Sequence, residues 1–299
     1  MIRKVFPRQN LWMNPVNHDW IEYEKYMPHI WSLWKVFSDA NPPLKGSEEF
    51  VSMLCDAGNY LWEQERRDDG LAMLQTAKAV FESISPSHDT RDDKEYAKTL
   101  CLMACLLCGG GITGRSEGRE YFGQVLELRK QHFAMIPRDM VSNGDRFLLA
   151  NGFNDFACGL LHDSSYWEAE SPLREALALK RACGTEDKFK AEFAEAFKNI
   201  SYVLLAKDQC QDAVTNMRRA TELALDVYRE SSAAYQLHLF HLGCVLYTSG
   251  RIEESLQIHQ KVMRSRKDQV FGEHHEHTLN SYYAVGFIDW KTNRLLDAR

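Results

Sequence analysis

The segment Gly109 to Ser116 has the residue spacing of a phosphate-binding loop. Four residues separate Gly109 from Gly114, and a basic residue and a serine follow. Such a loop also needs a strand before it, a helix after it, and a lysine that reaches the phosphates. Here Arg115 replaces the lysine, and the preceding apolar run from Leu100 to Cys108 has no β-branched residue, which favours a helix. We interpret the segment as a widened turn between paired helices, with nucleotide binding as the alternative.

Three cysteines could begin a metal site. Cys101, Cys105 and Cys108 follow the i, i+4, i+7 spacing of one helix face. A zinc site usually has four ligands that arrive from turns, and neither a fourth ligand nor that spacing is present nearby. We predict that these cysteines are small packing residues, and that all eight cysteines of the chain are reduced.

Histidines and carboxylates offer two further chemistries. His274, His275 and His277 could share a metal ion, but we interpret them as linker residues before the last helix. The acidic run from Glu63 to Asp69 is typical of a solvated helix face. No Gly-x-Ser-x-Gly element occurs. We therefore predict no catalytic residues, no cofactor and no metal, and an enzyme of unrecognised type is only a third hypothesis.

Composition narrows the class of protein. The chain has 299 residues, of which 44% are hydrophobic and 26% charged, as in ordinary folded proteins. Its net charge of -6 gives no overall attraction to nucleic acid or anionic lipid. No apolar run approaches the roughly 18 residues that cross a bilayer, and the N-terminus lacks a secretory pattern. We predict a cytoplasmic protein with no nucleic-acid or membrane partner.

A turn followed by small residues recurs along the chain. Gly250 is followed by Ser255 and Val262, and Asp208 is followed by Ala213 and Ala220 at the same spacing. The two turns lie 42 residues apart (250 less 208), which indicates a helical repeat array. Such arrays usually present binding surfaces.

Each repeat is expected to contain two antiparallel helices. In the copy at 234–262, the first helix should pack through Leu239, Leu242, Gly243 and Leu246, which share one face. Gly250 should end that helix, and the second should begin at Arg251. The same frame fits four further copies upstream. The final repeat is incomplete: its first helix carries Tyr282, Val285 and Gly286, and its second helix begins at Leu295 just before the chain ends.

This pattern of large and small residues resembles the tetratricopeptide repeat from about Glu49 onward. The long second helix and the segment Val270 to Ser281 are similar to kinesin-light-chain-like repeats, although Glu276 follows His275 where those have proline. The resemblance implies an all-α α-solenoid that forms a right-handed superhelix. Residues 47–299 would contain about five helical pairs plus an incomplete last one, after an N-terminal helical cap at residues 1–46.

The cap should be an aromatic-rich helix from about Trp20 to Phe37. Pro28 would bend or split it, and Ser47 should cap the first repeat helix. The region also resembles the segment that follows the nucleotide-binding module in fungal NLR-type (STAND) ATPases. The nucleotide-binding module itself is absent from this sequence. That resemblance implies a stand-alone sensor or scaffold. The residues that carry it are Phe6 to Gln9, Trp12, Trp20, Tyr26 to Ile30 and Phe50 to Trp62.

If the repeats stack, positions beside the packing face of each first helix point into a concave groove. Asparagine amides there can pair with an extended peptide backbone, and aromatic rings can anchor side chains. The predicted partner-binding residues are Asn154, Asn199, Tyr202, Phe240, His241 and Tyr247. We therefore expect a non-catalytic scaffold or adaptor for a protein or peptide partner. The alternative is an accessory or regulatory protein of a fungal secondary-metabolite biosynthesis pathway.

Overall fold

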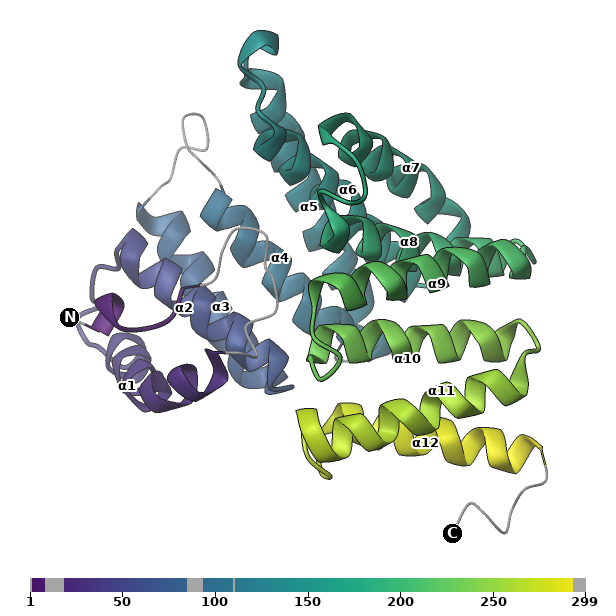
Figure 1. Cartoon of the computed structure of the whole chain (residues 1–299). Helices are drawn as coiled ribbons and strands as arrows, with labels where there is room; N and C mark the ends of the chain where they lie inside the picture. Colours follow the sequence, from purple (N-terminus) through teal and green to yellow (C-terminus); the bar gives the residue numbers. More distant parts are fainter. Residues whose placement is uncertain (1, 9–18, 85–93, 110, 293–299) are drawn as a thin grey trace. The chain divides into compact units, whose positions relative to one another are not determined.

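The computed structural model describes all residues except 1, 9–18, 85–93, 110 and 293–299 (Figure 1). The described residues form twelve α-helices with short helical turns and no strand. The chain divides into two compact units, Met1–Ser164 and Ser165–Arg299. The predicted all-α class of stacked helical hairpins is thus confirmed.

The described residues of unit 1 form two helical hairpins, an additional helix at each end and two short 3₁₀ turns. Within it, α2 packs on α3, α4 packs on α5, and α2 also contacts α4. The elements of unit 1 are η1 (Ile2–Lys4), α1 (Trp20–Ser38), α2 (Glu48–Glu63), α3 (Arg67–Ile84), α4 (Lys94–Gly109), α5 (Ile112–Met135), η4 (Arg138–Met140) and α6 (Asn143–His162).

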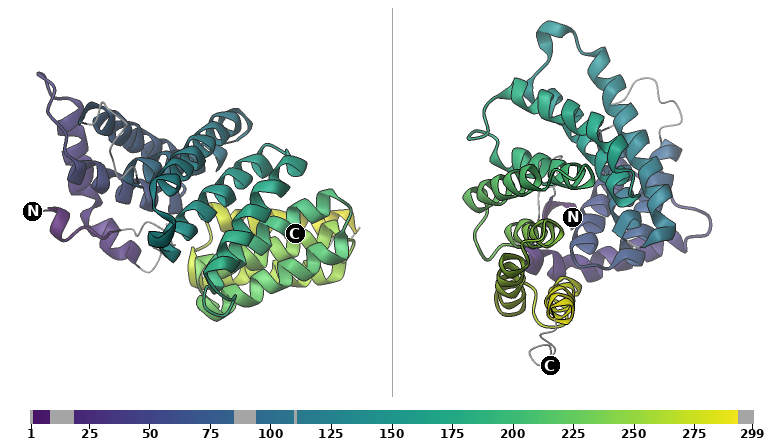
Figure 2. Two further views of the ribbon diagram at one scale, coloured as in Figure 1. Left: turned by 90° about the horizontal axis from the view of Figure 1, so that it is seen from above. Right: turned by 90° about the vertical axis from the view of Figure 1, so that its right-hand side faces the viewer.

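Unit 2 is itself a stack of helices (Figure 1). Each helix from α7 to α12 packs on the next, and α8 also contacts α10. In the right-hand view of Figure 2, α10, α11 and α12 are seen nearly end-on. The elements of unit 2 are α7 (Tyr166–Cys183), α8 (Lys190–Ala206), α9 (Cys210–Val227), α10 (Ala233–Thr248), α11 (Ile252–Ser265), the π-helical turn η5 (Arg266–Val270) and α12 (Glu276–Lys291).

Helix α1 is continuous, although Pro28 lies inside it. Tyr23, Met27 and Ile30 form one stripe of this helix and are buried against the core of unit 1. Ser47 caps α2 by accepting a hydrogen bond from the backbone N–H of Phe50, which confirms the predicted N-cap. The proline therefore does not split the helix, because its exposed position leaves the buried stripe intact.

The recurring turn of the sequence is a left-handed residue after the first helix of a hairpin. Glu65, Ser164, Asp208 and Gly250 have φ angles of 57°, 62°, 60° and 78°. At Gly250 the next backbone N–H, that of Arg251, bonds back to the carbonyl of Leu246. This is the arrangement that closes many helix C-termini, and glycine adopts it at least cost.

The small residues after each turn allow close helix packing. Ser255 is fully buried, and its Oγ donates to the Gly243 carbonyl at 2.7 Å. A Cβ at position 243 would lie 2.6 Å from Nε2 of His259, so only glycine fits between α10 and α11. The equivalent glycine of α12, Gly286, has no described atom within 4 Å of such a Cβ. The predicted start of a partner helix at Leu295 lies outside the described residues.

Candidate functional site

The first helices α8, α10 and α12 carry one recurring set of side chains beside their packing faces. Gly286 follows Gly243 by 43 residues, and the caps Ser232 and His275 are separated by the same number. Phe240, Cys244 and Tyr247 of α10 therefore correspond to Tyr283, Phe287 and Trp290 of α12. We call these six positions, together with Tyr202 and His241, the aromatic groove.

Two of the predicted residues, Tyr202 and His241, form a pair between α8 and α10. The tyrosine hydroxyl hydrogen-bonds to Nδ1 of the imidazole, and the rings meet edge to face at 5.7 Å. Burial raises the pKa of Tyr202 well above its usual value and lowers the pKa of His241 well below its own. Both groups are therefore neutral near pH 7, and the pair offers polar contact without charge.

Phe240 is held in place from two sides. The ring of His259 meets it edge to face at 5.0 Å, and the Arg266 guanidinium lies 4.6 Å from its centroid. Burial lowers the pKa of His259 to about 4 and that of Arg266 to about 10. At neutral pH the arginine is charged and the histidine is not, so Phe240 has a cation–π contact.

Arg266 also holds α12 in position relative to α10 through hydrogen bonds to both helices. It is almost fully buried, and its Nη1 donates to the His277 carbonyl at 2.8 Å and to Ser281 Oγ at 3.0 Å. Its Nη2 reaches the Gln236 carbonyl at 3.4 Å. Because these acceptors lie at the starts of α10 and α12, one side chain from η5 ties the two groove helices together.

An apolar cavity of about 290 Å³ lies between α10 and α12. Tyr247 and Phe287 both line it, and their rings meet edge to face with centroids 5.7 Å apart. Tyr283 stacks on Phe287 at 6.0 Å and remains 73% exposed, and Trp290 is 54% exposed. The cavity is lined by Phe240, Cys244, Tyr247, Thr248, His259, Asn280, Tyr283, Ala284, Phe287 and Ile288. Its size and lining suit one large apolar side chain.

Four of the six predicted partner-binding residues lie in the aromatic groove, and Phe240 and Tyr247 also line the cavity. The rings of α12, Tyr283, Phe287 and Trp290, were not predicted. Adding the 43-residue period to the α10 positions would have found them. Arg266 had no such signal, because its role depends on where three carbonyl and hydroxyl groups meet in space.

The two predicted asparagines lie elsewhere. Asn199 on α8 has the same register as His241 and is 3% exposed. Asn154 on α6 belongs to unit 1 and is also buried. Their binding role therefore stays a prediction, whereas the exposed rings of the groove are accessible as they stand.

The loop-like segment Gly109 to Ser116 joins two helices. Helix α4 precedes it, as the composition predicted, and α5 begins at Ile112. A Cβ at position 114 would lie 2.5 Å from the Leu107 carbonyl, so Gly114 allows α4 and α5 to approach closely. The strand that a phosphate-binding loop requires is therefore replaced by a helix, and helix packing accounts for this glycine.

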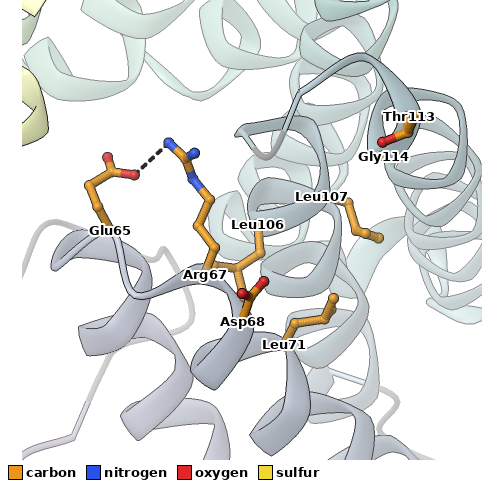
Figure 3. A pocket seen from close by; sticks show the side chains of 8 residues that line it. All are labelled: Glu65, Arg67, Asp68, Leu71, Leu106, Leu107, Thr113 and Gly114. Atoms are coloured by element: carbon orange, nitrogen blue, oxygen red, sulfur yellow. Dashed lines mark hydrogen bonds and ion pairs between the residues drawn. The ribbon is translucent and has the colours of Figure 1, made fainter.

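A polar pocket of about 410 Å³ adjoins this turn (Figure 3). In it, Arg67 Nη2 donates to Glu65 at 2.7 Å, and Asp68 lies on the same wall. Phosphate groups would meet two carboxylates and an arginine that is already paired. The remaining lining residues are Leu71, Leu106, Leu107, Thr113 and Gly114. This charge pattern does not favour a nucleotide.

Burial, helix capping and ring stacking account for the cysteine and histidine clusters. Burial raises the pKa of Cys108 to about 11, so its thiol is protonated near neutral pH. His275 caps α12 by accepting from the His277 N–H, and its ring stacks on Phe271 at 4.3 Å. The described residues contain no group of three or more histidine, cysteine or acidic side chains placed to hold a metal ion. In the same part of the chain, every helix is too short or too polar to cross a bilayer.

Comparison with known proteins agrees with this architecture. A profile described as Tetratricopeptide repeat matches residues 241–277, which include the second half of α10, all of α11 and the start of α12. No curated protein sequence matches the chain. Tetratricopeptide-type repeat proteins are generally non-catalytic scaffolds.

Three solved structures are similar in fold. BtubC (BKLC) from P. vanneervenii is 13% identical, with a TM-score of 0.50 over 85% of this chain and 92% of that one. A Rap protein complexed with Competence and Sporulation Factor is 12% identical, with a TM-score of 0.51 over 93% and 74%. The assembly chaperone of RpL4, Acl4, is 14% identical, with a TM-score of 0.51 over 94% and 98%. At these identities the likeness concerns the fold alone.

Proposed function

We propose that this chain is a non-catalytic scaffold that binds a protein or peptide partner in the aromatic groove of unit 2. The observation that carries the proposal is the apolar cavity between α10 and α12, which is lined by the exposed ring of Tyr283 and by Phe287, with the exposed ring of Trp290 packed on Phe287. Large exposed rings beside an apolar cavity are costly in water and are typical of binding surfaces.

The geometry of the groove supports a side chain inserted from a partner. Tyr247, Phe287 and Phe240 supply apolar walls, while the neutral Tyr202–His241 pair supplies hydrogen-bonding atoms farther along the face. Arg266 fixes the spacing of α10 and α12 before any partner arrives, which lowers the ordering cost of binding. Two proteins of similar fold are recorded with partners: Rap with its signalling factor, and Acl4 as the chaperone of RpL4.

The narrower hypotheses stay predictions. They are the kinesin-light-chain-like subclass, the relation to fungal NLR-type proteins, the role beside fungal metabolite enzymes and the cytoplasmic location. The first three rest on the sequence patterns Phe6 to Trp62 and Val270 to Ser281, and the last rests on the lack of a secretory pattern and of a long apolar run. The groove proposal does not depend on them.

Panning a displayed random-peptide library against the full chain tests the groove. We expect enriched peptides that share one large apolar residue. Replacing both groove rings, Tyr283→Ala with Trp290→Ala, should weaken their binding by about tenfold or more in fluorescence anisotropy.

The matched control is Trp167→Ala, because Trp167 is 67% exposed in unit 2 but, unlike Tyr283 and Trp290, is not part of the aromatic groove. It should change affinity by less than about twofold. Enriched peptides that bind equally well to the groove variant, or more weakly to the Trp167 variant, would show that the binding surface lies elsewhere.

A further inference from the structure

The segment Ile2 to Pro7 lies against α2, where two side chains anchor it. Arg3 and Phe6 are these anchors, while Val5 between them is 51% exposed. The backbone N–H groups of Val5 and Phe6 bond to the carbonyl of Ile2 within the segment itself. We call residues 2–7 the docked segment. It is thus held mainly through side chains, as a bound peptide would be.

The arginine anchor is a fork on a buried carboxylate. Asp56 is fully buried, and Arg3 Nη1 donates to its Oδ2 at 2.6 Å. Arg3 Nη2 donates to Ser52 Oγ at 2.8 Å, so both arms of the guanidinium are used. This geometry suits arginine better than lysine, because a guanidinium has fixed, planar donors.

The phenylalanine anchor is an aromatic pocket one helical turn along. Phe6 is 2% exposed and meets Tyr23 edge to face at 5.1 Å. Tyr23 in turn stacks on Tyr60 of α2 at 5.2 Å. The Tyr23 hydroxyl is buried and has no hydrogen-bond partner among the described residues. A ligand that reached this hydroxyl would gain a hydrogen bond that the docked segment does not make.

The site also tolerates being empty. Lys98 Nζ donates to Asp56 Oδ1 at 3.0 Å from the other side, so the carboxylate keeps a cationic partner when Arg3 leaves. Removing Arg3 therefore does not leave an isolated buried charge, which is the usual large cost of breaking a buried ion pair. A segment with few anchors and its own internal hydrogen bonds can open locally.

We propose that this site on α1 and α2 binds an Arg-x-x-Phe segment of a partner protein, and that the docked segment is an internal ligand that competes with it. The docked segment itself defines the chemistry: a guanidinium for Asp56 and Ser52, and a ring for Tyr23, three residues apart. Because the internal ligand is tethered, its high effective concentration keeps the site closed to weak partners. The proposal is independent of the groove in unit 2.

The test uses the full chain with both anchors removed, Arg3→Ala with Phe6→Ala, and a labelled peptide of residues 2–8. We expect saturable binding in fluorescence anisotropy, and binding at least about tenfold weaker to the wild-type chain, whose own segment occupies the site. Peptides with alanine in place of the arginine or the phenylalanine should each bind about tenfold more weakly.

Ser52→Ala in the same background provides a matched control. It should weaken the natural peptide but not the peptide that lacks arginine. Should the double variant lose its helical circular dichroism, Arg3→Ala alone carries the test, and the natural peptide must then bind that chain more tightly than the arginine-free peptide does. Absence of saturable binding to a folded variant at about 1 mM peptide, or equal binding to wild type, would overturn the proposal. Self-association of the wild-type chain that Arg3→Ala abolishes would also overturn it, in favour of a second copy as the ligand.

Discussion

The first-helix faces of the two units have opposite chemistry. In unit 1, the position that corresponds to His241 is Asp56 on α2 and Asp155 on α6, and both are ion-paired within the unit, by Lys98 and by Arg129. In unit 2, the same face carries aromatic rings on α10 and α12, two of them largely exposed. One repeat pattern therefore yields a face that is satisfied internally and another that is open.

The difference shows that the same face of the repeat can stabilise the fold in one unit and be available for binding in the other. A buried carboxylate must keep a buried cationic partner at all times, which for Asp56 is Lys98 when Arg3 leaves, so unit 1 gains definition from its ion pairs but cannot lose Lys98 cheaply. An exposed ring contributes little to folding and retains its apolar area for a ligand. The predictions below test this division.

The largest effect is expected at Lys98. Lys98→Met removes the almost fully buried cationic partner of Asp56 and keeps only the more exposed of its two ion pairs, the one with Arg3; we expect a loss of about 3 kcal/mol in the free energy of unfolding. The matched control is Lys78→Met, which breaks the partly exposed Lys78–Glu82 pair and should cost below about 1 kcal/mol. Urea unfolding of the full chain measures both. Equal losses would mean that the face of unit 1 is not under electrostatic constraint.

Acid should weaken unit 2 through His259. Burial, followed by the nearby Arg266, lowers its pKa to about 4 from a usual 6.5, so the unfolded chain binds a proton there that the folded chain refuses. The contribution of the neutral His259 to the free energy of unfolding is therefore fully present above pH 6.5. It decreases as the pH falls toward 4, by up to about 3 kcal/mol.

Urea unfolding at pH 7 and pH 5 checks this prediction, and the quantity to compare is the difference between wild type and His259→Gln. The free energy of unfolding of His259→Gln should depend less on pH than that of wild type. The control His274→Gln, at an exposed histidine, should show the wild-type pH dependence. Identical pH dependence in all three chains would contradict a neutral, buried His259.

Two glycines at the same repeat position should respond with opposite signs. Gly243→Ala places a Cβ 2.6 Å from His259 between α10 and α11, and we expect a loss of about 1–3 kcal/mol. Gly286→Ala meets open space and should gain about 0.5–1 kcal/mol, because alanine favours a helix interior. Thermal unfolding of both variants suffices. A loss at Gly286 comparable to that at Gly243 would mean that the outer face of α12 is covered.

The smallest effect is expected in the aromatic groove itself. Tyr283→Ser and Trp290→Ala should each change the free energy of unfolding by less than about 1 kcal/mol, since both rings are largely exposed. Phe193→Ala, at a fully buried ring of the same unit, should cost about 3–5 kcal/mol in the same assay. Groove variants as damaging as Phe193→Ala would make the rings part of the core and remove the contrast between the two units.

The sequence by itself determined the helices, their pairing and the turns. Small residues such as Gly243 and Ser255 recur at fixed spacing because the packed helices leave little room there, whereas Gly250 suits the positive φ of the turn. Such local constraints can be recognised in one chain. The helical nature of the run before Gly109 followed from composition for the same reason.

Only the tertiary structure decided which side chains meet. Arg266 gains its role from acceptors on α10 and α12 that lie as many as 30 residues away, and Arg3 finds Asp56 at a separation of 53. No local pattern encodes such meetings, because they depend on how the helices stack. The repeat period placed the groove on the first helices, and the contacts between those helices determined where it is open and where it is filled.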